Sequence, residues 1–397
     1  MARSERRRAS AWLTTALLCL AWLLPGLAAA AAPRIGVMTM EPGEIFWERF
    51  GHNSLVVQDP ATGQALSYNF GFFDLDEPGF HWNFVRGRME YRLEVLPIER
   101  DLAYYRHVGR GVMVQWLALE PAQASALAAA LAENARPENA RYTYDYYTAN
   151  CSTRVRDALD QALGGQLQAQ LIGRSQGNTW RSESVRLAAP APWMALGFHL
   201  GLGGSADRPL SRWEEAFIPM RLRDALREVK LADGRPLVAD EETLLPHRLA
   251  PPPAEAPQVS GKAFLAGLAL AAMVLLAGKR APRALAGFAL AFWTLAGLAG
   301  LVMAFIWLGT AHTAGHANQN LLLLSPLCLA LLPGGWARLR GREPSARFRV
   351  LLWVVTGGAA LAGFLKFLPF LPQQNVEWVV VLLPLHWALL RSLDPKR

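Results

Sequence analysis

Cysteine is scarce in this sequence, and its few cysteines are poorly placed for pairing. There are three in 397 residues. Cys19 and Cys328 are both embedded in long hydrophobic runs, whereas Cys151 stands alone outside such runs. We therefore expect Cys151 to act in some way other than by forming a disulfide.

Charged residues are also few, and they are unevenly distributed. Only 18% of the residues are charged, whereas 52% are hydrophobic. Residues 33–260 have the composition of a soluble chain, but residues 261–392 are nearly continuous apolar segments. The net charge is +8, and much of it flanks the apolar segments. We interpret these charges as determinants of membrane topology and expect no nucleic-acid partner.

The first residues have the pattern of a secretory signal. "MARSERRRAS" contains four arginines, "AWLTTALLCLAWLLPGLA" is an apolar core, and "AAAAAP" offers small residues for cleavage near Ala32. An uncleaved N-terminal anchor is the alternative. A lipobox needs a small residue before its cysteine, and Leu18 precedes Cys19, so lipidation is not expected there. In either case the chain from about Pro33 is exported.

Five apolar segments follow the soluble part, at residues 263–278, 284–308, 320–337, 350–371 and 376–391. The loops that follow the second and fourth segments contain no Lys or Arg, whereas the other loops and the C-terminal tail are rich in Arg. The positive-inside rule places the Arg-rich loops in the cytoplasm. The sequence thus predicts a multi-pass protein of a bacterial inner (cytoplasmic) membrane, with its soluble domain in the periplasm.

These features predict four parts of the chain. They are a signal peptide or anchor at 1–32, a periplasmic domain at 33–249, a tether at 250–262 and a five-helix transmembrane region at 263–392. The tether, "APPPAEAPQVSGK", is rich in proline. Because it is short, the domain is expected to work close to the bilayer surface.

The periplasmic domain shows a mixed α+β pattern. Strands are predicted at "PRIGVMTM", "HNSLVVQD", "QALSYNFGFF", "MEYRLEVLP" and "GVMVQWLALE". Helices are predicted from Pro97 to His107, at "PAQASALAAALAENA" and at "CSTRVRDALDQALGG".

Cys151 lies at the predicted start of the third of these helices. The N–H groups and dipole of a helix N-terminus lower the pKa of a thiol and so favour the nucleophilic thiolate. Ser152 and Thr153 are candidate caps, and Arg154 adds positive charge. The alternative is a small buried hydrophobe, a role that suits a free cysteine. A lone thiol is unusual in an exported domain, however, which favours a functional role.

A thiol nucleophile needs a base, and His52 is the best candidate. It follows a glycine in "RFGHNSLVV" and begins a predicted apolar strand. A structural histidine is the alternative at such a position. A third residue should orient the imidazole from a neighbouring strand. "YNFGFFD" supplies Asn69 and Asp74, and Asn69 is preferred if the two strands form a hairpin.

Four stretches occur in an order that resembles a known family. They are "FGHNSLVV", "YNFGFFD", "TYDYYTANCSTRVRD" and "HTAGHANQNLLLLSPL". A histidine at a strand start followed by an "NC" opening a helix resembles the circularly permuted papain-like thiol enzymes. These include permuted relatives of the NlpC-type hydrolases and the lecithin:retinol acyltransferase group. The closer resemblance is to the Lnb-type family, which has an N-terminal periplasmic domain and a C-terminal membrane bundle. It covers most of the chain, weakly between about 165 and 260.

The resemblance implies lipoprotein N-acylation, in which an acyl chain moves from a phospholipid to the N-terminal amine of a lipoprotein. Cys151 would be the nucleophile, His52 the base and Asn69 the third catalytic residue. The implied partners are a phospholipid acyl donor, a lipoprotein acceptor and the membrane, and no cofactor is implied. The implied fold is α+β and permuted papain-like (NlpC-type), followed by about five transmembrane helices.

The outer loop carries a polar cluster of its own. His312, Asn318 and Asn320 match the family pattern best, which implies binding of a lipid head group or of the incoming amine. His312 and His316 stand four apart and could ligate zinc from a helix. The segment is expected to be a loop without an HExxH glutamate, so no metal is predicted. A solvated loop is the alternative.

Two other functions stay open from the sequence. One is a periplasmic cysteine hydrolase that cuts peptidoglycan peptides or lipid esters, although such a hydrolase of peptidoglycan would not need five membrane spans. The other is a non-enzymatic membrane scaffold whose exported domain binds a partner. The sequence leaves the oligomeric state open.

Overall fold

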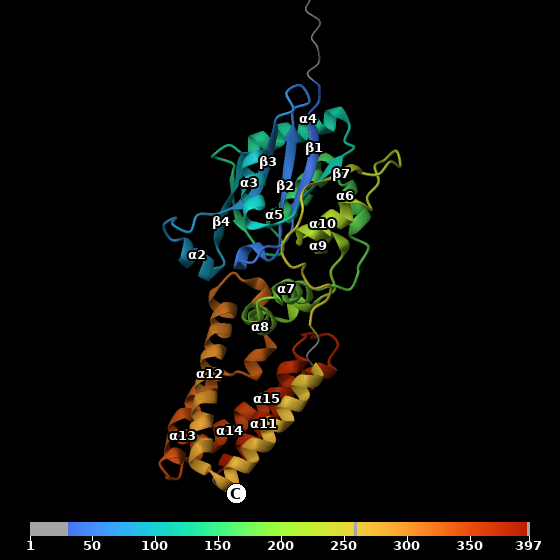
Figure 1. Ribbon diagram of the computed structural model, residues 1–397. Helices are drawn as coiled ribbons and strands as arrows, with labels where there is room; N and C mark the ends of the chain where they lie inside the picture. Colours follow the sequence, from blue (N-terminus) through green and yellow to red (C-terminus); the bar gives the residue numbers. More distant parts are fainter. Residues whose placement is uncertain (1–30, 258–259, 395–397) are drawn as a thin grey trace, which may run out of the picture.

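The computed structural model describes residues 31–257 and 260–394. It has two parts, an α+β domain built on one sheet and a bundle of apolar helices (Figure 1). The fold class is therefore α+β with a membrane-type bundle, as the sequence predicts. The predicted signal at 1–32 lies almost wholly outside the described residues and stays a prediction.

Seven strands form one antiparallel sheet in the order β6-β4-β3-β2-β1-β5-β7. They are β1 (Arg34–Met40), β2 (His52–Gln58), β3 (Ala65–Phe72), β4 (Met89–Pro97), β5 (Val112–Leu117), β6 (Arg141–Tyr144) and β7 (Val238–Leu245). β2 and β3 form a hairpin in which Leu55 pairs with Tyr68. The hairpin and the first five strands confirm the prediction, whereas β6 and β7 were not predicted.

Helices cover both faces of the sheet. One face packs against four helices: α4 (Pro121–Asn134), α5 (Cys151–Ala162), α6 (Gln166–Leu171) and α10 (Pro219–Leu226). The other face packs against α3 (Ile98–Val108).

Burial on both faces accounts for the apolar run in β1. Side chains of a strand point alternately to its two faces. Val37 contributes to the core under α5, and Met38 contributes to the core under α3. Both side chains are completely buried. A central strand covered on both sides thus needs apolar side chains at successive positions.

A layer of short helices lies between the sheet and the bundle (Figure 1). The domain's remaining helices are η1 (Phe46–Glu48), α2 (Phe80–Arg86), α7 (Trp180–Ala188), α8 (Pro192–Gly201), η2 (Gly204–Asp207) and α9 (Arg212–Glu215). Arg181 of α7 is buried and donates to the Asp207 carboxylate at 2.8 Å. It also donates to the carbonyls of His199 and Leu202. This one side chain therefore holds α7, α8 and η2 together.

Five segments of the bundle are long and apolar enough to cross a membrane. Their α-helices are α11 (Ser260–Arg280), α12 (Pro282–Gly309), α13 (Leu332–Leu339), α14 (Ala346–Phe364) and α15 (Val376–Leu393), and three further 3-10 turns are η3 (Thr313–Gly315), η4 (Gln319–Leu322) and η6 (Leu365–Phe367).

The third segment, Gln319–Leu339, differs from the uninterrupted apolar helix that its composition suggests. Before α13 it consists of η4 and η5 (Pro326–Leu331). Pro326 and Pro333 lie within it, and a proline cannot donate a helical backbone hydrogen bond. The first part of the segment therefore consists of 3-10 turns, and only its second part is α-helical.

The two loops without Lys or Arg contact the periplasmic domain directly. The N–H of Gly203 donates to the carbonyl of Ala314 at 2.7 Å. The N–H of Gln374 donates to the Asp207 carboxylate at 3.0 Å. Both loops are thus on the same side of the bundle as the periplasmic domain, in agreement with the topology that the loop charges predict.

Candidate active site

Cys151 is the first residue of α5, as the sequence predicts. The cap, however, is Asn150, whose side chain accepts a hydrogen bond from the N–H of Thr153 at 2.9 Å. Thr153 closes a capping box by accepting from the N–H of Asn150 at 2.8 Å. The prediction that Ser152 caps the helix is therefore wrong, and Thr153 takes part only as the partner of Asn150.

Ser152 instead fixes α5 to the rest of the domain. Its hydroxyl is completely buried and lies 2.6 Å from the carbonyl of Ala216 and 2.9 Å from Oδ1 of Asn53. Asn53 is the second residue of β2. The N-terminus of α5 is therefore held against the start of the strand that carries His52.

His52 is the first residue of β2, and Gly51 before it is required by the backbone. Gly51 has a φ of 77°, in the left-handed region that favours glycine. A Cβ atom at this position would also lie 2.9 Å from Sδ of Met220 and 2.9 Å from the carbonyl oxygen of Met40. The chain thus turns sharply into β2 through a space too small for a side chain.

Asn69, and not Asp74, contacts the histidine. The Oδ1 atom of Asn69 lies 3.1 Å from Nε2 of His52. Asp74 is exposed in the turn after β3, where it accepts a hydrogen bond from the N–H of Asp76. The hairpin of β2 and β3 therefore brings His52 and Asn69 together from adjacent strands.

A buried carboxylate behind Asn69 fixes its orientation. The Nδ2 atom of Asn69 donates to Asp101 at 3.0 Å and to the hydroxyl of Ser67 at 3.1 Å, and Ser67 in turn donates to Asp101. A carboxylate can only accept, so the amide nitrogen must face Asp101 and the oxygen must face His52. Nε2 of His52 then carries the proton, which leaves Nδ1 as the basic nitrogen.

The environment of the thiol favours its ionised form. Burial by itself raises the pKa of Cys151. The positive charge of His52, a hydrogen bond with His52, and the backbone N–H groups of Asn53 and Ser152 lower it, and together they outweigh burial. The pKa of Cys151 is consequently below its ordinary value, as is usual for reactive cysteines.

The environment of His52 favours its protonated form. Burial by itself lowers the pKa of His52, but the charge of Cys151 and a hydrogen bond with Cys151 raise it. The nearby positive charge of Arg110 opposes this increase, and the hydrogen bond to Asn69 supports it, so that the pKa of His52 is raised. The two shifts together favour a thiolate–imidazolium pair.

Arg110 is a buried cation whose charge acts on His52. It forms an ion pair with Glu48 at 3.3 Å, and both side chains are more than nine-tenths buried. The hydroxyl of Tyr104 donates to Glu48 at 2.5 Å. Glu48 is thus the buried counter-charge of Arg110.

Tyrosine side chains connect the thiol to the outer loop of the bundle. A Cβ atom at Gly71 would lie 3.7 Å from both Cys151 and Tyr144, so these two side chains flank the same spot. The ring centroid of Tyr144 is 5.8 Å from that of Tyr146. Tyr146 stacks on His312 with a centroid distance of 6.0 Å.

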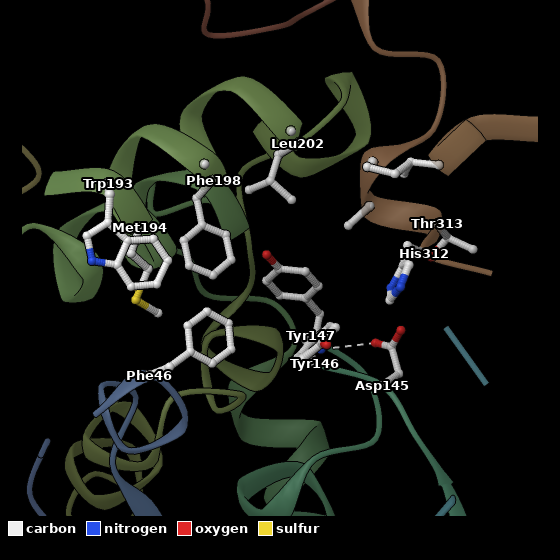
Figure 2. Close-up of a pocket in the computed structure, with 15 residues that line it drawn as sticks. Phe46, Asp145, Tyr146, Tyr147, Trp193, Met194, Phe198, Leu202, His312 and Thr313 are labelled. Atoms are coloured by element: carbon white, nitrogen blue, oxygen red, sulfur yellow. Dashed lines mark hydrogen bonds between the residues drawn. The ribbon is translucent and has the colours of Figure 1, made fainter. Parts of the chain in front are cut away.

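His312 thus lies near the periplasmic site although it belongs to the membrane half. Its Nε2 atom is 3.0 Å from the carbonyl oxygen of Phe84 in α2. It also lines a cavity together with Tyr146 and Phe198 (Figure 2). Of the three outer-loop residues that the sequence predicts to bind substrate, His312 is the one at a cavity wall.

Asn318 and Asn320 lie elsewhere, in a buried contact between the loops and α8. Both amide nitrogens donate to the carbonyl of Leu200, at 2.8 and 3.0 Å. Gln373 donates to Asn318 at 2.8 Å and Asn375 donates to Asn320 at 2.7 Å. These hydrogen bonds occupy both amides, and they tie the second outer loop to the first.

Asp101 is not among the site residues predicted from the sequence, although the sequence carries a signal for it. Ile98, Leu102 and Tyr105 form the apolar face of α3, and Asp101 lies on that same face. A carboxylate on the buried face of a helix needs a partner. The position of Asp101 on the apolar face can be recognised only when the helix itself is predicted correctly.

Among the described residues, no group of three or more His, Cys, Asp and Glu side chains is arranged to hold a metal ion. His312 and His316 belong to the turns around η3 and not to one helix. The Nε2 atom of His316 lies 3.1 Å from the carbonyl oxygen of Thr310. The two histidines are therefore engaged with different backbone carbonyls.

Comparison with known proteins adds two matches. The model of the Lnb N-terminal periplasmic domain matches residues 28–186, and that of the Lnb transmembrane domain matches residues 261–393. No curated protein and no solved structure matches the chain. The two regions include the thiol site and the whole apolar bundle, so this is a multi-pass membrane protein with a periplasmic N-terminal domain. The chain belongs to the Lnb family.

Proposed function

We propose that this protein is a thiol acyltransferase that moves an acyl chain from a phospholipid, through a thioester on Cys151, to the N-terminal amine of a lipoprotein. The observation that supports this most is the position of the thiol. Cys151, paired with His52, is linked through Tyr144 and Tyr146 to His312 in an outer loop of the bundle. A thiol at the membrane surface suits a phospholipid donor and a lipid-anchored protein acceptor.

The first half-reaction acylates the enzyme. His52 accepts the proton of Cys151 at Nδ1, and the thiolate attacks the ester carbonyl of the phospholipid. A C–S bond forms and the ester C–O bond breaks. The leaving alkoxide takes the proton from His52 and departs as a lysophospholipid. The N–H of Ser152, which already acts on the thiol, is placed to stabilise the oxyanion.

The second half-reaction transfers the chain. The α-amine of the lipoprotein attacks the thioester carbonyl, so that a C–N bond forms and the C–S bond breaks. His52 accepts the proton that the amine loses, and the thiolate of Cys151 is regenerated. Asn69 keeps the imidazole in the tautomer that both steps require.

The domain is proposed to be a circularly permuted papain-like fold. The support is the chain order His52, Asn69, Cys151, together with a cysteine that opens a helix packed on an antiparallel sheet. The histidine comes from one strand and its amide partner from the next.

The decisive experiment uses a bacterial strain that lacks its own lipoprotein N-acylation step. The full chain, Cys151→Ala and Cys151→Ser are expressed, and the N-terminal lipopeptides are weighed by mass spectrometry. We expect one added acyl chain with the wild type and none with either variant. If the wild type reaches the membrane but adds no chain, the proposal fails and a cysteine hydrolase becomes the better interpretation. A Cys151→Ala protein that adds the chain would instead exclude a thiol mechanism.

A further inference from the structure

A cavity of about 270 Å³ lies where the periplasmic domain meets the outer loop. Trp193, Met194 and Phe198 of α8 line one side, and Phe46 lies across from them (Figure 2). His312 is on the side of the bundle. The lining is overwhelmingly apolar, so the cavity suits hydrocarbon better than a polar ligand.

Two glycines of α8 keep this cavity open. Gly197 and Gly201 are four residues apart, so they share a face of the helix, and both line the cavity. A Cβ atom at either position would have no neighbour within 4 Å. By contrast, a Cβ atom at Gly315, which also lines the cavity, would lie 2.7 Å from Ile306 and 3.2 Å from the carbonyl oxygen of Gly201. Gly315 is needed for close packing, but Gly197 and Gly201 are not.

Such glycines are costly to the helix. Gly197, in the interior of α8, destabilises the helix by about 0.5–1 kcal/mol relative to alanine, whereas Gly201 is the last residue of the helix. Packing does not require them here, because the space beside them is empty. A requirement for that empty space explains their presence, since any larger side chain would reduce the cavity.

The cavity adjoins the outer end of a membrane-type helix. Ile306, near the outer end of α12, is one of its lining residues. On the domain side, Trp193 is 68% exposed and Leu196 is 51% exposed. Exposed Trp and Leu side chains level with the end of a membrane helix are typical of the bilayer interface. This position suits entry of a lipid chain into the cavity from the bilayer interface.

The inner wall of the cavity leads toward the thiol. Tyr146 lines the cavity and contacts Tyr144, which flanks Cys151. A chain whose carbonyl lies at Cys151 would therefore pass two tyrosine rings before entering the cavity. An acyl chain bound in this position has its carbonyl next to Cys151. Under the proposed reaction, this is the chain that the phospholipid donates.

We infer that this cavity binds the transferred acyl chain of the phospholipid donor and that Gly197 and Gly201 set the space available to it. This inference rests on the proposed function for its choice of ligand. Filling the cavity from Gly197 would then weaken binding of the chain and favour shorter chains.

Binding can be tested without turnover. The full chain carrying Cys151→Ala is reconstituted in nanodiscs with a phospholipid that bears a photoreactive diazirine on one acyl chain. After irradiation, we expect label in α8 and in residues 312–315. Adding Gly197→Leu should lower this label about tenfold, the size of effect expected for overfilling a packed apolar site. Gly197→Ala should lower it less.

The matched control is Gly357→Leu in α14. Gly357 is also a helical glycine with no neighbour within 4 Å of an added Cβ atom, but it does not line the cavity. It should leave the label unchanged. The bundle helices face the lipid of the nanodisc, so their label is the background present in every variant. Absence of label from α8 and residues 312–315, or label there that Gly197→Leu does not reduce, would overturn the inference. Label from a photoreactive lipopeptide, but not from the phospholipid, would overturn the choice of donor.

Because Cys151→Ala cannot turn over, this result is independent of the reaction. Protein that is labelled in the cavity but adds no acyl chain to lipoproteins would refute the proposed function and leave the lipid site standing. In active protein, Gly197→Leu should shift the preferred donor to shorter chains, while Gly357→Leu keeps the wild-type preference.

Discussion

The amide of Asn69 donates to the carboxylate of Asp101 at 3.0 Å, and this bond determines which end of the amide faces His52. Asp101 is buried and belongs to α3, which covers one face of the sheet. Cys151 belongs to α5, which covers the other face. Asp101 touches no reacting atom, so we regard it as a positioning residue.

Asp101→Asn should therefore reduce turnover with little change in KM. An asparagine can donate as well as accept, so the Asn69 amide loses its single favoured orientation and His52 loses its fixed tautomer. Loss of such a supporting contact typically costs about 10–100-fold in activity. The measurement is kcat and KM of the reconstituted full chain, with the pH profile of kcat as a further readout.

Asp74→Asn is the matched control, because Asp74 is an exposed acid of the same domain that does not contact His52. It should leave kcat unchanged. A merely structural role for Asp101 would lower the amount of folded protein but leave the pH profile of the remainder unaltered. That outcome, or equal losses in the two variants, would contradict a positioning role.

The pH dependence of thiol reactivity tests the ion pair itself. The pKa of Cys151 is lowered mainly by His52, which opposes the effect of burial. Alkylation of Cys151 by iodoacetamide should thus continue at pH values below the usual thiol pKa of about 8.5. His52→Ala removes the attraction and leaves burial, which raises the pKa, so the alkylation profile should move to higher pH.

Labelling is measured by peptide mass spectrometry, so that Cys19 and Cys328 are distinguished from Cys151. Asn69→Ala should shift the profile less than His52→Ala, because Asn69 acts on the thiol only through the histidine. A wild-type profile that follows an ordinary thiol would show that the pair is not formed.

The local pattern of the sequence was sufficient to predict the elements of the site. Alternating strands and a helix after "NC" predicted that His52 begins a strand and Cys151 begins a helix, and both are so. Such predictions depend on contacts between residues that are near in sequence. The hairpin that joins His52 to Asn69 spans 17 residues and follows from one turn.

The features that could not be predicted from the sequence depend on contacts between residues far apart in the chain. β7 pairs only with β5 at the sheet edge. Five of its eight residues are exposed and three of these are acidic, so it has no alternating apolar pattern. The carboxylate of Asp101 is 32 residues from Asn69. The cavity is lined by residues from four separate regions of the chain, and its α8 glycines appear in the sequence only as residues of low helix propensity.

Gly51 provides a test of the entry into β2. Gly51→Ala introduces a left-handed backbone strain and two contacts of 2.9 Å with Met220 and Met40. Gly63→Ala introduces a similar strain, since Gly63 has a φ of 72°, but an added Cβ atom there has no neighbour within 4 Å. Gly51→Ala should thus be less stable than Gly63→Ala by about 1–3 kcal/mol, the usual cost of overpacking.

The difference is measured as the thermal midpoint of the purified full chain, followed by tryptophan fluorescence. Gly51→Ala should also slow alkylation of Cys151, because Met40 and His52 are paired at the displaced strand end. Equal midpoints for the two variants would mean that the strand entry has more space than the structure gives it.

The variant Asn320→Ala distinguishes the predicted substrate-binding role of Asn320 from a structural role. The amide of Asn320 is completely buried, donates to the carbonyl of Leu200 at 3.0 Å and accepts from Asn375 at 2.7 Å. Asn320→Ala removes the acceptor of the buried Asn375 amide, while the carbonyl of Leu200 keeps its hydrogen bond from Asn318. A buried donor left unsatisfied in this way costs about 1–3 kcal/mol. We expect a lower thermal midpoint, with kcat and KM per folded molecule unchanged.

Gln374→Ala is the control for this contact, because Gln374 is an exposed residue of the facing loop that contributes its backbone N–H to Asp207. It should preserve the midpoint. If Asn320 instead binds a lipid head group or the incoming amine, Asn320→Ala would raise KM while the midpoint stays close to that of the wild type. The two roles thus predict opposite behaviour of the same two quantities, and a single variant with its control distinguishes between them.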